Sequence, residues 1–360
     1  MANELGRNSP RKTLSRKKKN TLVLTVIAVL VLVFFFAGLT VGPANLGFVP
    51  SLQALFGIGD KGSVTIVQTI RLPRALAALI AGAGLSVAGL IMQTTLKNPM
   101  ASPATLGVSN AAVFGANLAI IGFAGGFLST GNNIQNYVAG INPYLTSAVA
   151  FFFAFVSTLL ILGLCKIRSF SAETVVLAGL ALGTVWGALT TLLQYYATDV
   201  GLAATYLWSF GSLDRATFET DWIMLSVVAV ATIVFFILQW RFNALSSGEE
   251  IAQSLGVKVS LLRFVALLLA STITAVVVSY LGVIGFVGII CPHAMKRIVG
   301  HNHKILIPAS LLSGSLLLLF ADFVSTLVGQ GTAIPIGAVT ALLGGPFFLY
   351  LVFARKGDKA

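Results

Sequence analysis

The chain has 360 residues, of which 57% are hydrophobic and 9% are charged, and its mean hydropathy is +0.94. A soluble protein of this size needs much more polar surface, so the composition excludes a soluble globular fold and predicts an integral membrane protein. The net charge of +12 fits membrane topology and contact with anionic lipid, without an acidic partner or nucleic acid.

A basic tail, residues 1–20, precedes an uncharged segment of 19 residues, Thr21–Leu39. The tail includes RKTLSRKKKN, a pattern also found in nucleic-acid patches and at the start of secretion signals. The apolar segment is longer than the core of a typical signal, and no clear cleavage pattern follows it. The sequence therefore favours an uncleaved first membrane helix with a cytoplasmic tail.

Further apolar segments of about 20 residues, the length that crosses a bilayer core, follow along the chain. With the first, the predicted spans are Thr21–Leu39, Leu72–Leu96, Ala104–Leu128, Tyr144–Cys165, Thr174–Ala197, Trp222–Trp240, Leu261–Tyr280, Ile284–Val299, Ile305–Val328 and Ile334–Phe353. They predict an all-α membrane protein with about ten transmembrane helices in one domain, residues 21–354. Residues 355–360 are a second cytoplasmic tail.

The number of spans depends on Phe264–Met295, 32 residues without a charge, which is long for one helix and short for two. Two helices joined around Gly282, Gly285 and Gly288 place both termini in the cytoplasm, as the positive-inside rule favours. In this topology all but four of the 23 Lys and Arg residues are cytoplasmic, and the outer four are Lys61, Arg71, Arg74 and Arg215.

A polar segment, Ala244–Ser260, interrupts the apolar pattern with the sequence ALSSGEEIAQSLGVKVS. It lies in a predicted cytoplasmic loop between spans six and seven, at about residues 241–262. Ser246 or Ser247 is expected to cap a short helix that ends at Gly256.

Within this short helix, Glu249 and Glu250 lie in the first turn, where acidic side chains suit the helix dipole. Ile251 and Leu255, four residues apart, form an apolar ridge that a cytoplasmic partner can bury. The alternative is a solvated loop on the lipid surface, and two glutamates beside an anionic leaflet argue against it.

Motifs for catalysis are absent from the sequence. It has no G-x-x-x-x-G-K-[ST] loop for ATP phosphates, no H-E-x-x-H and no G-x-S-x-G, so we expect neither enzyme activity nor a cofactor in this chain. Cys291, His293, His301 and His303 lie close in sequence, but their spacing matches no standard zinc pattern. An intramembrane metalloenzyme is thus a weak alternative, and no metal site is predicted.

Charged residues within spans are costly and mark functional candidates. Asp322 lies towards the outer end of the ninth span, and Glu173 lies at the cytoplasmic start of the fifth. A secondary carrier that works without ATP would need more such groups paired across helices, so that class is a weaker alternative. Two prolines in Leu96–Ser109, LKNPMASPATLGVS, break the helix at the cytoplasmic face and predict a gate.

Three ordered blocks, Arg71–Ala116, Leu281–Asp322 and Ile334–Leu351, resemble the permease subunits of the iron-chelate, haem and cobalamin ABC importers, the type II importers. The blocks include RLPRALAALIAGAGLSVAGLIMQ, GFVGIICPHAMKRIVGHNHK and IPIGAVTALLGGPFFLYL. The resemblance covers about residues 47–353 and agrees with the expected number of spans.

The resemblance implies a permease that imports an iron chelate, either a siderophore complex or haem, by alternating access across the cytoplasmic membrane of a prokaryote. Cobalamin is the alternative substrate. The implied partners are a second permease copy or paralogue, two ABC ATPase subunits that bind ATP and Mg, and an extracytoplasmic substrate-binding protein.

The resemblance also implies roles for individual residues. The ATPase-coupling set is Ser247, Glu249, Glu250, Ile251, Leu255 and Gly256. The cytoplasmic gate set is Asn98, Met100, Ser171, Ala172 and Glu173. Arg71 and Arg74 are implied to dock the binding protein, with snorkelling to lipid headgroups as the alternative. Relatives often have D-x-x-A-R near the outer end of the ninth span, where this chain has Ser325 and Thr326, so docking is expected to be weaker or differently arranged.

Overall fold

The computed structural model describes residues 10–42, 44, 46–124, 142–167, 171–329 and 334–353. In this part of the chain every regular element is a helix, which confirms the all-α fold. The tail predicted at residues 355–360 and the first nine residues of the N-terminal tail lie outside the described residues.

Seven stretches among the described residues are long and apolar enough to cross a bilayer. They belong to α1 (Pro10–Thr40), α3 (Lys61–Thr65) continued through η1 (Ile66–Arg71) into α4 (Leu72–Thr95), α7 (Pro143–Ile167), α8 (Ala172–Tyr195), α10 (Phe218–Ile237), α13 (Val259–Leu281) and α15 (His303–Val328). Three shorter helices fall on other predicted spans: α5 (Val108–Asn117) with η2 (Leu118–Phe123), α14 (Val287–Val299) and α16 (Ile336–Phe353). A multi-span helical membrane protein is confirmed, whereas ten spans and two cytoplasmic termini stay predictions.

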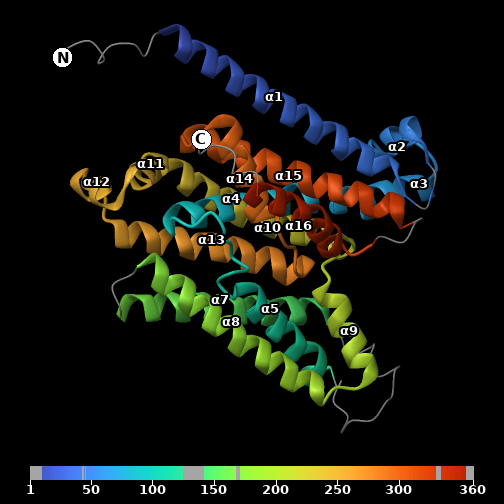
Figure 1. Cartoon of the computed structure of the whole chain (residues 1–360). Helices are drawn as coiled ribbons and strands as arrows, with labels where there is room; N and C mark the ends of the chain where they lie inside the picture. The colour runs from blue at the N-terminus through green and yellow to red at the C-terminus, as the bar shows by residue number, and fades with distance from the viewer. Residues whose placement is uncertain are drawn as a thin grey trace, which may run out of the picture.

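Short helices lie at the two ends of the bundle. They are α2 (Phe48–Leu55), α9 (Asp199–Ser209), η4 (Leu213–Arg215), α11 (Gln239–Ser247) and α12 (Glu249–Ser254). Figure 1 shows α11 and α12 at one end of the long helices, and α2, α3 and α9 at the opposite end. The end with α12 is the predicted cytoplasmic end.

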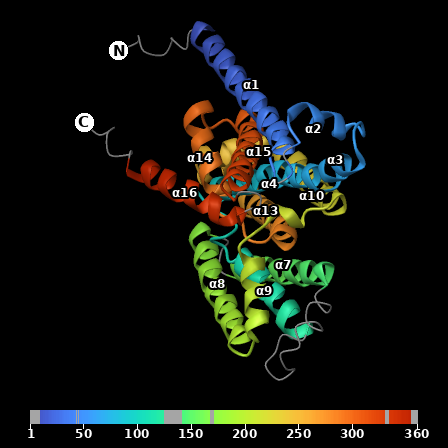
Figure 2. The ribbon, with the colours of Figure 1, turned by 90° about the vertical axis from the view of Figure 1, so that its right-hand side faces the viewer.

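Helix α4 lies at the centre of the larger of two helical groups. Most of its residues from Pro73 to Thr95 are buried, and α10, α13, α14 and α15 pack around it (Figures 1 and 2). A helix that is apolar around its whole circumference belongs in the interior of a bundle. Close crossing depends on glycine, since a Cβ at Gly89 would lie 1.8 Å from the carbonyl oxygen of Gly288 on α14.

Helices α5, α7 and α8 pack on one another and form the second group, with α9 beside them (Figures 1 and 2). Helix α13 contacts both α5 and α7 as well as α4, so it joins the two groups. Its own end is marked by Gly282, whose φ of +80° lies in the left-handed region, and α14 begins at Val287. The predicted break in the long uncharged segment is therefore confirmed. Helix α14 has only 13 residues, so a full crossing by this helix stays a prediction.

Candidate functional site

The polar segment between α10 and α13 forms two short helices rather than one. They meet at Gly248, whose φ of +143° is rarely adopted by a residue with a side chain. The hydroxyls of Ser246 and Ser247 donate back to the carbonyls of Phe242 and Asn243. The prediction that one of these serines caps the short helix is therefore wrong, because both belong to the last turn of α11.

The rest of the short helix agrees with the sequence prediction. Glu249 and Glu250 lie in the first turn of α12. Gly256, with a φ of +80°, follows its end, and its N–H donates to the carbonyl of Gln253 at 2.9 Å. A glycine in this conformation is a common way to stop a helix.

Helix α12 presents an apolar ridge to the outside of the chain. The side chains of Ile251 and Leu255 are 50% and 59% exposed, whereas Ala252 between them is buried. Figure 1 places α12 at the extremity of the bundle. Exposed apolar side chains on a short helix are typical of a surface that a protein partner covers.

An ion pair holds this helix against the bundle. The carboxylate of Glu249 accepts hydrogen bonds from both terminal nitrogens of Arg263 on α13, at 3.2 Å and 2.7 Å. The Nε of Arg263 donates to the carbonyl of Thr95, the last residue of α4, at 3.1 Å. Arg263 is buried, so one guanidinium fixes the start of α12 and the end of α4 together. The sequence pattern already contained a signal for it, since Arg263 is a charge within a predicted span.

A cavity of about 780 Å³ lies beside this ion pair. It brings together residues of both predicted gate segments with the coupling helix: its lining includes Asn98, Ser171, Ala172, Glu173, Glu249 and Arg263. Met100 is not part of this lining, and its side chain is 49% exposed. Four of the five predicted gate residues therefore share one cavity with Glu249, although the residues are far apart in sequence.

Local hydrogen bonds fix the two gate segments at the cavity. The side-chain oxygen of Asn98 accepts from the N–H of Met100 at 2.9 Å, which closes a turn after α4. The hydroxyl of Ser171 accepts from the N–H of Thr174 at 3.1 Å and caps the start of α8. Glu173 is exposed in the first turn of α8, where its charge suits the helix dipole.

The two arginines predicted to dock a binding protein both have partners inside the chain. Arg71 is buried, and its guanidinium donates to the backbone carbonyls of Leu39, Thr40 and Ala44 at 2.9, 2.9 and 2.6 Å. These carbonyls lie at the end of α1 and just beyond it, so Arg71 fastens α1 to the start of α4. In this conformation the Arg71 side chain lies beneath the outer surface.

Arg74 lies in a network of two carboxylates. It donates to Asp322 on α15 at 2.8 and 2.6 Å, pairs with Asp214 of η4, and reaches the hydroxyl of Thr326 at 3.3 Å. The side chain of Arg74 is 16% exposed, compared with 7% for Asp322 and 50% for Asp214. Thr326, at the position where the sequence resemblance implies an outer arginine, is thus part of the same network. Docking of the binding protein by Arg71 and Arg74 stays a prediction.

Arg215, another predicted outer cation, is also held inside the chain. Its guanidinium donates to the carbonyls of Trp208 and Leu207 at 3.2 and 2.7 Å and lies 5.7 Å from the centre of the Trp208 ring. Burial lowers the pKa of Arg215 from its usual value, and the carboxylate of Asp214 acts in the opposite direction. An arginine remains charged under such a shift, so it still contributes positive charge at this end.

Two members of the cysteine and histidine group, Cys291 and His303, are buried and have hydrogen-bond partners. The ring of His303 lies 3.0 Å from the hydroxyl of Thr94 and 2.8 Å from the side-chain oxygen of Asn243. Cys291 is buried, and its thiol donates to the carbonyl of Ser313 at 3.5 Å. Within the described ranges, no group of three or more His, Cys, Asp or Glu side chains is placed to hold a metal ion.

The structure thus defines a helical multi-span membrane protein with an exposed short helix at one end, beside a cavity between helix ends. The chain belongs to the FecCD transport family, whose model matches residues 30–354. This family membership confirms the resemblance to the permease subunits of ABC importers for iron chelates, haem or cobalamin. A permease of this family is a multi-pass membrane component and is not itself catalytic.

Individual relatives match this chain over most of its length. The chain is 40% identical over 344 residues to a putative ABC transporter permease protein of Methanocaldococcus jannaschii, with 95% of this chain and 97% of that protein covered. It is 35% identical over 302 residues to a cobalamin import system permease protein of Halobacterium salinarum. This match covers 84% of this chain and 76% of that protein. A solved inward-facing conformation of a putative metal-chelate type ABC transporter superposes with a TM-score of 0.78 at 29% identity, over 93% of this chain and 99% of that one.

Proposed function

We propose that this chain is the permease subunit of an ATP-driven importer that moves an iron chelate, a siderophore complex or haem, across the cytoplasmic membrane of a prokaryote. The family and the similarity to a metal-chelate type transporter support this substrate class. The importer contains a second permease copy or paralogue, two ABC ATPases that bind ATP and Mg, and an extracytoplasmic binding protein. No cofactor belongs to this chain.

The observation that carries the proposal is the exposed ridge of α12 on a helix tied to the gate cavity. An ATPase that covers Ile251 and Leu255 can displace α12. The ion pair of Glu249 with Arg263 links this displacement to the bundle. Arg263 passes this displacement to the carbonyl of Thr95, next to the gate segment that begins after α4. Each cycle of ATP binding and hydrolysis by the partner ATPases would thereby open and then close the gate at the cytoplasmic end of the pathway. This is the motion that alternating access requires.

The second permease belongs on the open side of the gate cavity. One chain supplies both gate segments to a cavity of about 780 Å³, which is within the size range of small-ligand sites. An iron chelate fills a comparable space or more, so two facing copies supply a pathway wide enough for the cargo. The binding protein docks on the opposite end, near the network of Arg74 and with α1 held in place by Arg71.

Cobalamin is the second candidate substrate, because a relative at 35% identity is named a cobalamin import permease. The two candidates are separated by uptake into proteoliposomes that contain the permease with its ATPase and binding protein. Uptake of a ferric siderophore or haem that labelled cobalamin does not inhibit supports the iron chelate. Preferential uptake of cobalamin would show that cobalamin, rather than an iron chelate, is the substrate.

The permease assignment is tested by affinity purification of the full chain in mild detergent, followed by mass spectrometry of the proteins that accompany it. We expect a P-loop ATPase to be recovered. Leu255→Asp should abolish this recovery, because it places a charge in the apolar ridge. Gln253→Asp is the matched control, since it adds the same charge on the same helix away from the ridge.

One result would contradict the permease assignment, and another would contradict the role of the ridge. Purification without any ATPase under gentle conditions would favour an ATP-independent carrier. Equal loss of the ATPase with both variants would show that helix charge, rather than the ridge, determines binding.

A further inference from the structure

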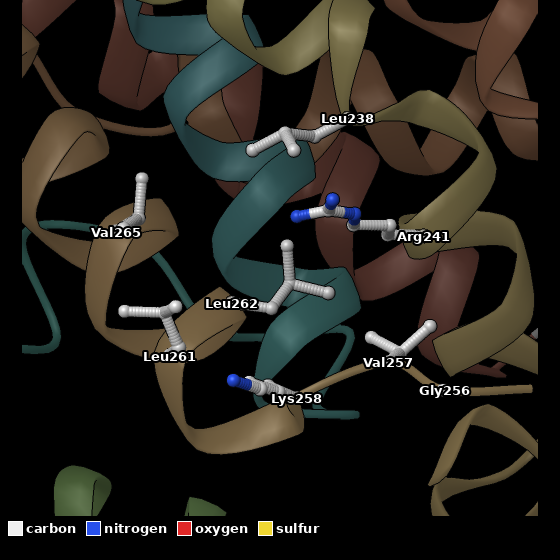
Figure 3. A pocket seen from close by; sticks show the side chains of 8 residues that line it. All are labelled: Leu238, Arg241, Gly256, Val257, Lys258, Leu261, Leu262 and Val265. Atoms are coloured by element: carbon white, nitrogen blue, oxygen red, sulfur yellow. The ribbon is translucent and has the colours of Figure 1, made fainter. Parts of the chain in front are cut away.

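A second cavity, of about 430 Å³, lies beside α12 where the end of α10, the start of α11 and the first turns of α13 meet (Figure 3). Two cations, Arg241 and Lys258, contribute to its wall. The other lining residues are Leu238, Gly256, Val257, Leu261, Leu262 and Val265. The lining therefore combines positive charge with an apolar surface and contains no carboxylate.

Both walls of the cavity carry a cation and apolar side chains in the same order. On α13, Leu261 and Val265 follow Lys258 by three and seven residues, a spacing that places the three on one side of the helix. On the facing wall, Leu238 comes one turn before Arg241. Figure 3 shows Arg241 reaching towards α13, Lys258 at the lower end, and Leu238 and Val265 at the upper end. Each wall thus has a cation, Lys258 or Arg241, at the end near α12 and apolar side chains farther from α12.

The two cations are available to a ligand from outside the chain. Within the part of the chain that the structure describes, neither Arg241 nor Lys258 belongs to an ion pair, and both are exposed. The Arg241 guanidinium lies 5.5 Å from the centre of the Trp240 ring, which orients it without neutralising it. A negative group between the two cations would therefore have no competing carboxylate in the cavity wall.

The surroundings of the cavity are those of a helix surface at the edge of a membrane. Ile237 and Leu261 are 67% and 56% exposed, and Trp240 is 51% exposed. Exposed aliphatic side chains on membrane helices face lipid, and tryptophan is enriched at the level of the headgroups. Such surroundings fit the level at which a phospholipid headgroup meets its acyl chains.

We propose that this cavity binds an anionic phospholipid from the leaflet on the α12 side. The phosphate lies between Arg241 and Lys258, and one acyl chain follows Leu261 and Val265. Basic pockets between membrane helices on the cytoplasmic side recognise anionic headgroups in this way. Gly256, Val257 and Lys258 connect α12 to α13, so the bound lipid contacts the link that positions the coupling helix. The lipid site itself does not depend on the ATPase partner.

The test compares lipid retention by the purified full chain in native mass spectrometry, with dioleoylphosphatidylglycerol and dioleoylphosphatidylcholine as probes of equal acyl length. The wild-type chain should retain the anionic lipid about tenfold or more in preference to the zwitterionic one, given the contribution of two cations near a membrane surface. Arg241→Gln combined with Lys258→Gln should remove most of this preference. Lys166→Gln combined with Lys304→Gln removes two exposed cations outside the cavity and should leave the preference nearly unchanged.

A further variant separates a lipid from a free phosphate ion. Leu261→Ala combined with Val265→Ala keeps both cations and removes apolar wall, so phospholipid retention should fall severalfold. Unchanged phospholipid retention in this variant would overturn the proposed acyl-chain contact and leave a site that recognises only the anionic group. Equal losses in the cavity and control charge variants would show only general attraction by basic residues. Retention that survives Arg241→Gln with Lys258→Gln, while the ATPase is lost, would assign the cavity to the protein partner instead.

Discussion

Glu249 and Arg263 form a two-point ion pair that joins the start of α12 to the start of α13. Because Arg263 also donates to the carbonyl of Thr95, the same guanidinium reaches the end of the central helix α4. Both members of the pair line the gate cavity. The pair therefore connects the exposed ridge of α12 with the segment that follows α4.

The strength of this connection is measurable by a double-mutant cycle. Glu249→Gln, Arg263→Gln and their combination should show a coupling of about 1–2 kcal/mol, since Arg263 is buried but the Glu249 side chain is 38% exposed. Thermal unfolding in detergent gives the stability of each variant. In the assembled importer, Glu249→Gln should also lower the amount of substrate transported per ATP hydrolysed. Strict additivity of the two single changes would rule out the link.

Charge reversal at Glu250 tests the surface of α12 rather than its anchor. Glu250→Arg should abolish uptake while membrane insertion remains normal. The lost interaction with the helix dipole is only about 0.3–1 kcal/mol, so a large loss of transport must come from a partner contact. Glu250→Gln, which removes the charge without adding the opposite one, serves as the comparison and should retain more uptake than Glu250→Arg. Full uptake with Glu250→Arg would remove this loop from the coupling site.

The network around Arg74 should contribute strongly to stability. Arg74→Gln leaves the buried carboxylate of Asp322 without its cation, which costs about 3–5 kcal/mol for a buried pair. Asp214→Asn removes a half-exposed partner of the same arginine and should cost about 1 kcal/mol or less. Thermal unfolding of the detergent-solubilised chain compares the two.

A rescue variant separates charge from packing in this network. Arg74→Gln combined with Asp322→Asn should recover much of the lost stability, because no buried charge then remains unpaired. Equal melting temperatures for Arg74→Gln and Asp214→Asn would contradict the importance of burial. Normal stability with lost binding-protein affinity in Arg74→Gln would instead support a direct docking role.

Gly89→Ala should disrupt the crossing of α4 with α14. The added Cβ would lie 1.8 Å from the Gly288 carbonyl oxygen, a contact that only backbone movement can relieve. We expect a loss of about 1–3 kcal/mol or more, seen as a lower melting temperature and reduced yield of folded protein. Gly163→Ala on α7 is the control, because no atom lies within 4 Å of its added Cβ. That variant should be neutral or slightly more stable, since alanine is the better helix former.

Much of the architecture could be predicted from local pattern. Long uncharged segments give the membrane helices, and Gly282 ends α13 because its φ of +80° suits glycine. The acidic first turn of α12 and the glycine after it were also predictable. The serine caps were not, since the sequence gives no sign that Ser246 and Ser247 already belong to a preceding helix and that Gly248 makes the turn.

The partners of the charged residues could not be predicted. Arg74 and Asp322 are separated by 248 positions, and Arg263 reaches a carbonyl 168 positions away. Hydropathy assigns a residue to the membrane or to its surface, but it contains no information on which helix lies next to which. Arg71 was for this reason expected at the surface, whereas its guanidinium donates to backbone carbonyls at the end of α1 and just beyond it.

The sequence by itself determined that this protein is a membrane-embedded helical protein with a short polar helix in one loop, because burial in lipid constrains composition at every position of a span. Only the tertiary structure decided that Glu249, Arg263 and the two gate segments meet at one cavity. The reason is physical: the membrane acts on each residue separately, whereas ion pairs and cavities depend on packing between helices that are distant in the chain.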